Sequence, residues 1–245
     1  MLPEDRHATA LIALFVILFL PVLLASVGGA LGLVRRKREP RADGMRALSG
    51  VLQQLVLLGA LAVTMHEGWW SWASIGVGPR LESALIGVLA YAGYKLAHDR
   101  YQLWAATRSP APRDPKEWVT GLARFWPRVR WGKALVVLTL ALNGVTEEIV
   151  TRGIFVHTLG RVSGSLAIGV AFGLLVNVVM HAYQGFRTLV PHAVFYAISV
   201  VLMESPYGLL AAIALHVCAD LAHADGRKTL AYVRAVRRMR PAPAG

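Results

Sequence analysis

Apolar stretches, each close to the length of a membrane-spanning helix, recur along the 245-residue chain. A helix needs about 20 mainly apolar residues to cross a bilayer. Because unpaired backbone is excluded from lipid and the alternating strand pattern of a barrel is not visible, these stretches predict helices. We therefore predict an all-α polytopic membrane protein with about seven transmembrane helices, at residues 9–34, 47–65, 81–97, 133–159, 162–183, 188–203 and 207–223.

The net charge of +12 is concentrated in segments between alternate predicted helices and in the C-terminal tail, at 35–46, 100–133 and 227–240. By the positive-inside rule, this distribution predicts a multi-pass protein of the cell membrane with a cytoplasmic C-terminus. It also argues against nucleic acid as a partner and favours contact with anionic membrane lipids. The tryptophans within 69–72 predict an aromatic belt at the outer interface.

The segment 99–132, rich in proline and aromatic residues, predicts a cytoplasmic linker with a short interfacial helix. It divides three N-terminal helices from a set of four. The predicted organisation is thus 1–132 for the N-terminal helices and linker, 133–224 for a four-helix catalytic core, and 225–245 for a basic cytoplasmic tail.

Three charged residues, Glu147, Glu148 and Arg152, interrupt the fourth apolar stretch near its middle. Such residues are costly in lipid and normally face a bundle interior or a water-filled cavity. The i,i+4 spacing of Glu148 and Arg152 predicts an ion pair, whereas Glu147, about 100° round the helix, is left without that partner. From this helix alone, a purely structural ion-pair cluster is an open alternative.

Two later stretches carry polar residues at helical spacing. His216 and Asp220 are i,i+4, so the carboxylate can reach and orient the imidazole. The other stretch has a small or polar residue at every fourth position, which predicts a close-packing ridge that ends in a histidine: Ser165, Gly169, Gly173, Asn177 and His181.

A free carboxylate with two nearby histidines can carry out two kinds of hydrolysis. The carboxylate can take a proton from an attacking water while an imidazole polarises or shares it. Alternatively, Glu147, His181 and His216 can hold a divalent metal such as zinc with a water in the open position. In both cases water attacks the peptide bond, and neither a serine nor a cysteine nucleophile is needed.

The order Glu-Glu-x-x-x-Arg, a histidine closing the next helix, and His-x-x-x-Asp resembles the CPBP family of CAAX proteases and bacteriocin-processing enzymes, also called Abi. The likeness covers about residues 133–223. It implies an intramembrane endopeptidase whose cavity opens to the cytoplasm, acting on a hydrophobic or lipid-tethered peptide. Family members have been described both as metal-free glutamate proteases and as metalloproteases.

Carried over residue by residue, the resemblance makes Glu147 the general base and His181 a residue that helps hold the water. Glu148 and Arg152 form the supporting pair, and His216 with Asp220 stabilises the oxyanion. The chain departs from the family pattern at Asn177, where phenylalanine is usual, and at Asp220, where asparagine is common. Because a carboxylate cannot donate, we assign Asp220 to orienting His216.

Two other classes of function fit the same residues. One is a non-catalytic membrane protein that confers bacteriocin immunity or scaffolds a complex. The other is a proton-coupled transporter that uses the acid and the histidines as a relay.

Overall fold

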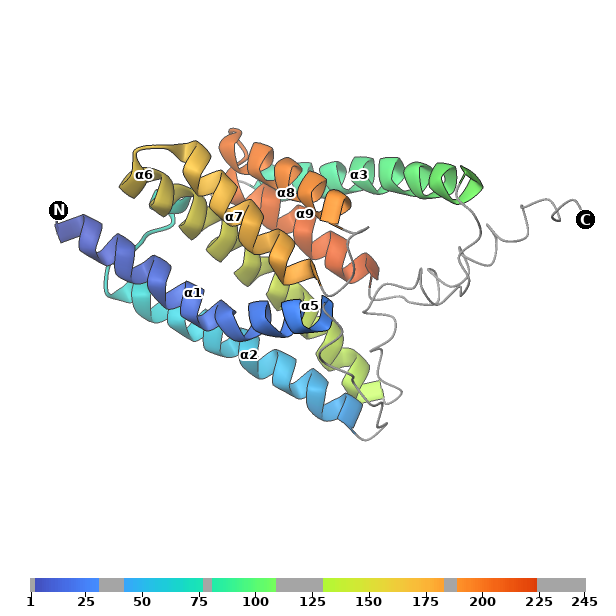
Figure 1. Ribbon diagram of the computed structural model, residues 1–245, viewed down its shortest axis with the longest axis horizontal. Coiled ribbons are helices and arrows are strands. Elements are labelled where there is room, and N and C mark those ends of the chain that lie inside the picture. The colour runs from blue at the N-terminus through green and yellow to red at the C-terminus, as the bar shows by residue number, and fades with distance from the viewer. Residues whose placement is uncertain (1–2, 31–41, 77–80, 109–129, 183–188, 224–245) are drawn as a thin grey trace, which may run out of the picture.

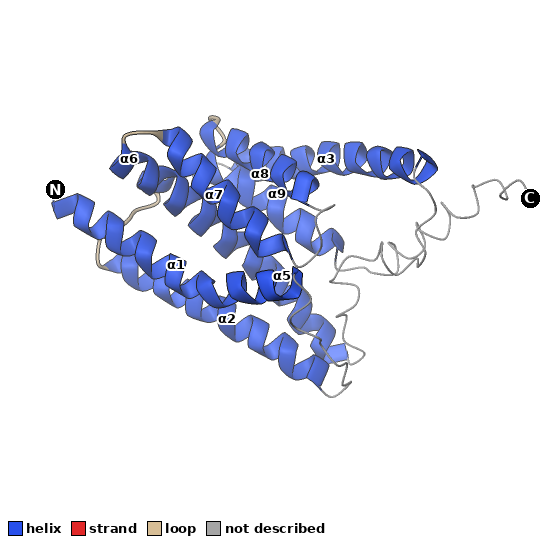
Figure 2. Ribbon diagram, in the orientation of Figure 1, coloured by secondary structure: helices blue, strands red, loops and turns tan. Residues whose placement is uncertain are grey.

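The computed structural model describes residues 3–30, 42–76, 81–108, 130–182 and 189–223. Within these ranges every regular element is helical (Figure 2). The elements are α1 (Pro3–Ala30), α2 (Ala42–His66), the short 3-10 helix η1 (Ala73–Ile75), α3 (Leu81–Arg108), α5 (Arg130–Glu148), η3 (Ile149–Thr158), α6 (Leu159–Ser163), α7 (Leu166–His181), α8 (Leu189–Glu204) and α9 (Gly208–His223). Since α5, η3 and α6 follow one another without a break, a helix is present at each of the seven predicted positions.

By length and composition, three helical segments of the described chain can cross a membrane: His7–Gly28, Leu48–His66 and Trp131–Ser163. Helices α7, α8 and α9 are apolar but shorter. Helix α3 is not among the segments that are long and apolar enough to cross a membrane. It continues to Arg108, so the start of the predicted 99–132 linker is helical. The linker residues 109–129, where the interfacial helix was expected, lie outside the described residues.

The rod formed by α5, η3 and α6 runs through the middle of the bundle (Figure 1). In Figure 1, α1 and α2 run along one flank of the bundle, where α2 packs on α5 and α1 packs on α7, and α3, α8 and α9 lie on the other flank. Helix α9 contacts α3, α5 and α8, while η3 contacts α1, α7 and η1. The central rod is therefore surrounded by protein on several sides, as its charged residues require.

The helix ends that adjoin the basic sequence segments all lie at one end of the bundle. The C-terminal ends of α1, α3 and α9 and the N-terminal ends of α2 and α5 are on the right in Figure 1. Their common placement is what the positive-inside rule requires of a single cytoplasmic face.

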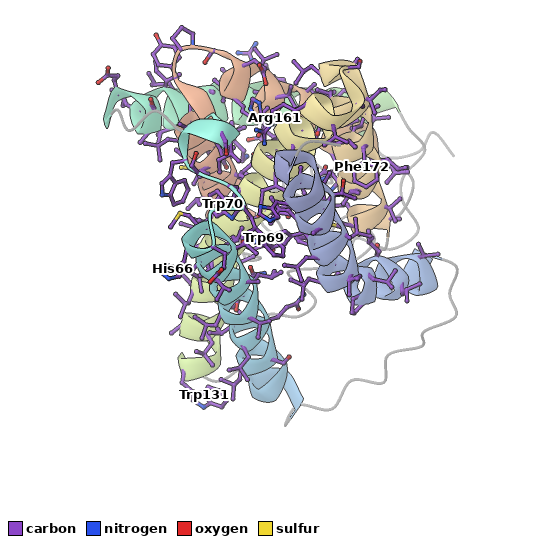
Figure 3. All side chains as sticks on the ribbon, turned by 90° about the vertical axis from the view of Figure 1, so that its left-hand side faces the viewer. His66, Trp69, Trp70, Trp131, Arg161 and Phe172 are labelled. Atoms are coloured by element: carbon purple, nitrogen blue, oxygen red, sulfur yellow. The ribbon has the colours of Figure 1, made fainter. Side chains whose placement is uncertain are left out.

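The tryptophans after α2 lie away from that end. Figure 3 shows Trp69 and Trp70 well separated from Trp131, which lies at the start of α5. Trp70 is buried, and its indole Nε1 donates a hydrogen bond of 2.9 Å to Thr64 Oγ1. Trp72 is 45% exposed. Trp70 is thus a core residue, and of these two tryptophans only Trp72 has the exposure of an interfacial residue.

Residues Ile149–Thr158 form a π-helix, with i→i+5 in place of i→i+4 bonding. All of its residues except His157 are buried. π-helical turns are rare and occur often at functional sites. The π-helix begins directly after Glu148. Glu147 and Glu148 are therefore the last residues of α5, and Arg152 lies in the π-helix.

The glycine ridge predicted on α7 packs against the π-helix. A Cβ atom on Gly169 would lie 2.2 Å from the carbonyl oxygen of Val156, and one on Gly173 would lie 2.9 Å from the carbonyl oxygen of Thr151. The backbones can approach this closely only because both positions lack a side chain. The ridge thus holds α7 against the segment that carries Arg152.

We expect Gly169→Ala to lower the free energy of unfolding by about 1–3 kcal/mol, because the added methyl overlaps the Val156 carbonyl oxygen. Gly59→Ala on α2 is the matched control, since a Cβ atom there meets nothing within 4 Å. Its effect should be neutral or slightly stabilising. Thermal unfolding of the purified protein in detergent measures both changes, and equal midpoints would contradict the packing described.

Candidate active site

The carboxylates of Glu147 and Glu148 are fully enclosed at the end of α5. Their exposed fractions are 1% and 0%, and that of Arg152 is 0%. Arg152 Nη1 lies 3.1 Å from Glu148 Oε1, which is the i,i+4 pair predicted from the sequence. Burial without such a partner would leave an uncompensated charge, which is strongly destabilising.

Arg152 also lies near the other carboxylate. Its Nη1 is 3.7 Å from Glu147 Oε1, five residues back along the chain. The i→i+5 geometry of the π-helix brings such residues into line, so the prediction that Glu147 lacks this partner is wrong. The guanidinium carbon lies 4.4 Å from the centre of the Tyr196 ring, a cation–π contact that further restrains it.

Glu147 is held mainly by two amides. Asn177 Nδ2, on α7, donates to Glu147 Oε1 at 2.7 Å. Asn143 Nδ2, one turn earlier on α5, donates to Glu147 Oε2 at 3.2 Å. Each carboxylate oxygen therefore has an amide donor, which fixes the plane of the group. Asn177, one of the two positions at which this chain departs from the family pattern, thus contacts Glu147 directly.

Glu148 connects three helices. Its Oε2 accepts a hydrogen bond of 2.6 Å from Ser199 Oγ on α8. Its Oε1 lies 2.6 Å from His216 Nδ1 on α9 and 3.1 Å from Arg152 Nη1. Glu148 therefore fixes the imidazole of His216 as well as pairing with Arg152. The sequence predicted only the second of these two contacts.

His216 presents its other ring nitrogen toward two carboxylates. Nε2 lies 4.0 Å from Glu147 Oε2 and 3.8 Å from Asp220 Oδ1. Asp220, which was expected to orient His216, is thus farther from the ring than Glu148 is. Asp220 Oδ2 instead accepts a hydrogen bond of 3.2 Å from Asn143 Nδ2. The imidazole is oriented across helices, by Glu148, rather than within α9.

His181 lies one turn beyond Asn177, at the end of α7. Its Nδ1 is 2.8 Å from the backbone oxygen of Asn177, and its ring stacks on that of His192 with centroids 4.0 Å apart. The structure thus brings five of the six predicted site residues into one network of close polar contacts. His181 lies at the edge of this network, in direct contact with His192.

Several members of this network were missed from the sequence. Asn143 precedes Glu147 by four residues, a spacing that could have identified it. Ser199 and His192 carry no motif, and each joins the site through the fold of α8. They illustrate contacts that only tertiary structure reveals.

The predicted metal ligands Glu147, His181 and His216 do not form a ligand cluster in this arrangement. Among the described residues, no group of three or more His, Cys, Asp or Glu side chains is placed to hold a metal ion. Both oxygens of Glu147 instead have amide donors. These three side chains are therefore not assembled as metal ligands in this arrangement, and metal dependence stays a prediction.

Replacing Arg152 with alanine should lower the free energy of unfolding by about 3–5 kcal/mol, because two buried carboxylates lose their shared cation. Arg161→Ala, at an exposed position of α6, is the matched control and should change stability little. Thermal unfolding midpoints in detergent measure the difference. If Arg152→Ala were as stable as Arg161→Ala, the ion-pair assignment would be wrong.

Comparison with protein-family models identifies a match over the catalytic-core segment predicted from the sequence. Residues 130–222 match the family model described as type II CAAX prenyl endopeptidase Rce1-like. No curated protein and no solved structure matches the chain. The matched segment begins at α5 and runs to the end of α9, so it includes every predicted site residue. The family is one of CAAX-type proteases, in agreement with the resemblance drawn from the motifs. Residues 130–222, which form the central rod and helices α7, α8 and α9, thus match an Rce1-like domain, and this match is consistent with a CAAX-protease-like family.

Proposed function

We propose that the protein is an intramembrane endopeptidase that cleaves a hydrophobic or lipid-tethered peptide by a glutamate-type mechanism. The observation that carries this proposal is the 4.0 Å separation of Glu147 Oε2 and His216 Nε2. This distance is too long for a direct hydrogen bond, but one water beside the gap can bond to both atoms. A buried carboxylate and an imidazole that share a water are the groups required for general-base hydrolysis.

In the proposed reaction, Glu147 accepts a proton from this water while the water oxygen bonds to the peptide carbonyl carbon. The carbonyl electron pair moves to its oxygen, which becomes an oxyanion. In its protonated form, His216 donates from Nε2 to that oxyanion. As the oxyanion re-forms the carbonyl and the C–N bond breaks, Glu147 returns the proton to the leaving amine. The products are a carboxylic acid and an amine, which ionise to a carboxylate and an ammonium group.

The surrounding residues prepare these two groups. Glu148 binds Nδ1 of His216, so that Nε2 is the nitrogen left facing Glu147. Arg152 offsets part of the negative charge of the two glutamates. We assign Asp220 to supporting Asn143 and the Nε2 side of His216. His181, half-buried at the end of α7, is assigned to holding the water or the substrate on the open side.

We prefer the glutamate-type mechanism to the metal-dependent one on the basis of the donor set. In the part of the chain that the structure describes, no three His, Cys, Asp or Glu side chains are placed to hold a metal ion together. The amide-held carboxylate is instead ready to accept a proton.

The substrate class and orientation rest on the family match and the charge pattern. The matched family is described by its action on CAAX prenyl proteins, which favours a lipid-tethered peptide. The common placement of the helix ends that adjoin basic segments favours a cytoplasmic C-terminus. We therefore propose that the site opens toward the cytoplasmic leaflet, where such a peptide would be anchored.

We expect the purified protein in proteoliposomes to cleave a prenylated CAAX peptide and Glu147→Gln to reduce the rate by about 10²–10⁴-fold, the usual contribution of a general base. Glu67→Gln, at an exposed position after α2, is the matched control and should retain full activity. Mass spectrometry of the peptide measures product formation. The same peptide without its lipid tests whether the tether is needed.

Equal cleavage by the wild type and Glu147→Gln would contradict the assigned base. Absence of cleavage by the wild type across prenylated, acylated and untethered peptides would instead favour the non-catalytic or transport alternatives.

A further inference from the structure

A further amide side chain, that of Gln54, contacts the site from outside the segment that matches the family model. Gln54 lies on α2, a helix long and apolar enough to cross a membrane, and only 6% of its surface is exposed. Its Nε2 donates to Asn143 Oδ1 at 3.1 Å, and its Oε1 accepts a hydrogen bond from the Thr146 hydroxyl. A glutamine in an apolar helix is stable when both ends of its amide are satisfied, as here.

The carboxylates of Glu147 and Asp220 determine which amide atoms of Asn143 and Gln54 donate and which accept. Ionised carboxylates only accept, so Asn143 must present Nδ2 to Glu147 and Asp220, each at 3.2 Å. Its Oδ1 then faces Gln54, which must present Nε2. The remaining oxygen of Gln54 faces the Thr146 hydroxyl, a group that can donate. Each member therefore fixes the amide orientation of the next.

We infer that Gln54 is a positioning residue for the proposed peptidase: through Asn143 it fixes the orientation of the Glu147 carboxylate. This role rests on the proposed function, because it assigns Gln54 to the same reaction. Asn143 Nδ2 is shared between two carboxylates on different helices, so a turn of this amide would withdraw a donor from both. Helix α2 thereby completes a site whose other residues lie between α5 and α9.

Two substitutions that change the hydrogen-bond donors and acceptors at position 54 distinguish a positioning role of Gln54 from a packing role. Gln54→Met keeps the approximate volume and removes both hydrogen bonds. Gln54→Glu keeps the shape, still accepts from Thr146, but offers Asn143 an acceptor where it needs a donor. Asn143 would then be drawn to turn its Nδ2 toward position 54, which places Oδ1 against Glu147 and Asp220. If Gln54 only fills space, Gln54→Glu should reduce kcat less than Gln54→Met does. If Gln54 positions Asn143, Gln54→Glu should reduce kcat more.

The first test needs no substrate. We expect the unfolding midpoint of the purified protein to fall in Gln54→Met and in Gln54→Glu, and each decrease to shrink when Asn143→Leu is already present, since coupled residues are non-additive. Gln53→Met, at the exposed neighbouring position, is the matched control and should be additive with Asn143→Leu. Additive effects of Gln54 and Asn143 would overturn the inferred coupling.

The second test measures cleavage of the peptide established for the wild type. We expect kcat to fall about tenfold in Gln54→Met, because Asn143 loses the hydrogen bond that orients it, and further in Gln54→Glu, with KM unchanged. Gln53→Met should retain the wild-type kcat. An unchanged kcat in both Gln54 variants, or a milder effect of Gln54→Glu, would overturn the positioning role.

The two tests separate the two possible failures. Coupled stability together with a wild type that cleaves no peptide would overturn the proposed function, and the catalytic role of Gln54 with it, while leaving the contacts intact. Additive stability together with normal cleavage would overturn the inference about Gln54 alone.

Discussion

Two adjacent carboxylates buried in an apolar helix are stable only when the fold supplies charge and hydrogen-bond donors to both. Here Arg152 reaches both acids, Asn143 and Asn177 hold Glu147, and Ser199 and His216 hold Glu148. These partners come from the central rod and from α7, α8 and α9, so the bundle must close correctly before the acids are compensated. The cost of burying the pair thereby ties the fold to the geometry of the site.

Two backbone features make that closure possible. The π-helix after Glu148 brings Arg152 into line with both acids, and the side-chain-free positions on α7 allow it to approach the π-helix closely. The approach of α7 delivers Asn177 to Glu147. The residues that look like packing features in the sequence therefore determine the distances in the site. Stability and the proposed chemistry depend on the same contacts.

The sequence predicted the helices well because long apolar stretches and i,i+4 spacing are local properties. Glu148 with Arg152 was predicted for this reason, and the histidine motifs led to the family that the match at residues 130–222 supports. Hydrophobic periodicity did not reveal the π-helix, so the contact of Arg152 with Glu147 was missed. The binding of His216 to Glu148 and the approach of Gln54 depend on how separate helices pair, which no local pattern contains.

The claim that Glu147 is the base of a membrane protease is tested most directly by comparing protein termini in the membranes of source cells. Cells carrying the wild type or Glu147→Gln at matched expression are compared by mass spectrometry of protein ends. We expect new termini only with the wild type, and these termini would identify the substrate. Identical sets of termini, with both proteins folded and present at equal levels, would contradict it.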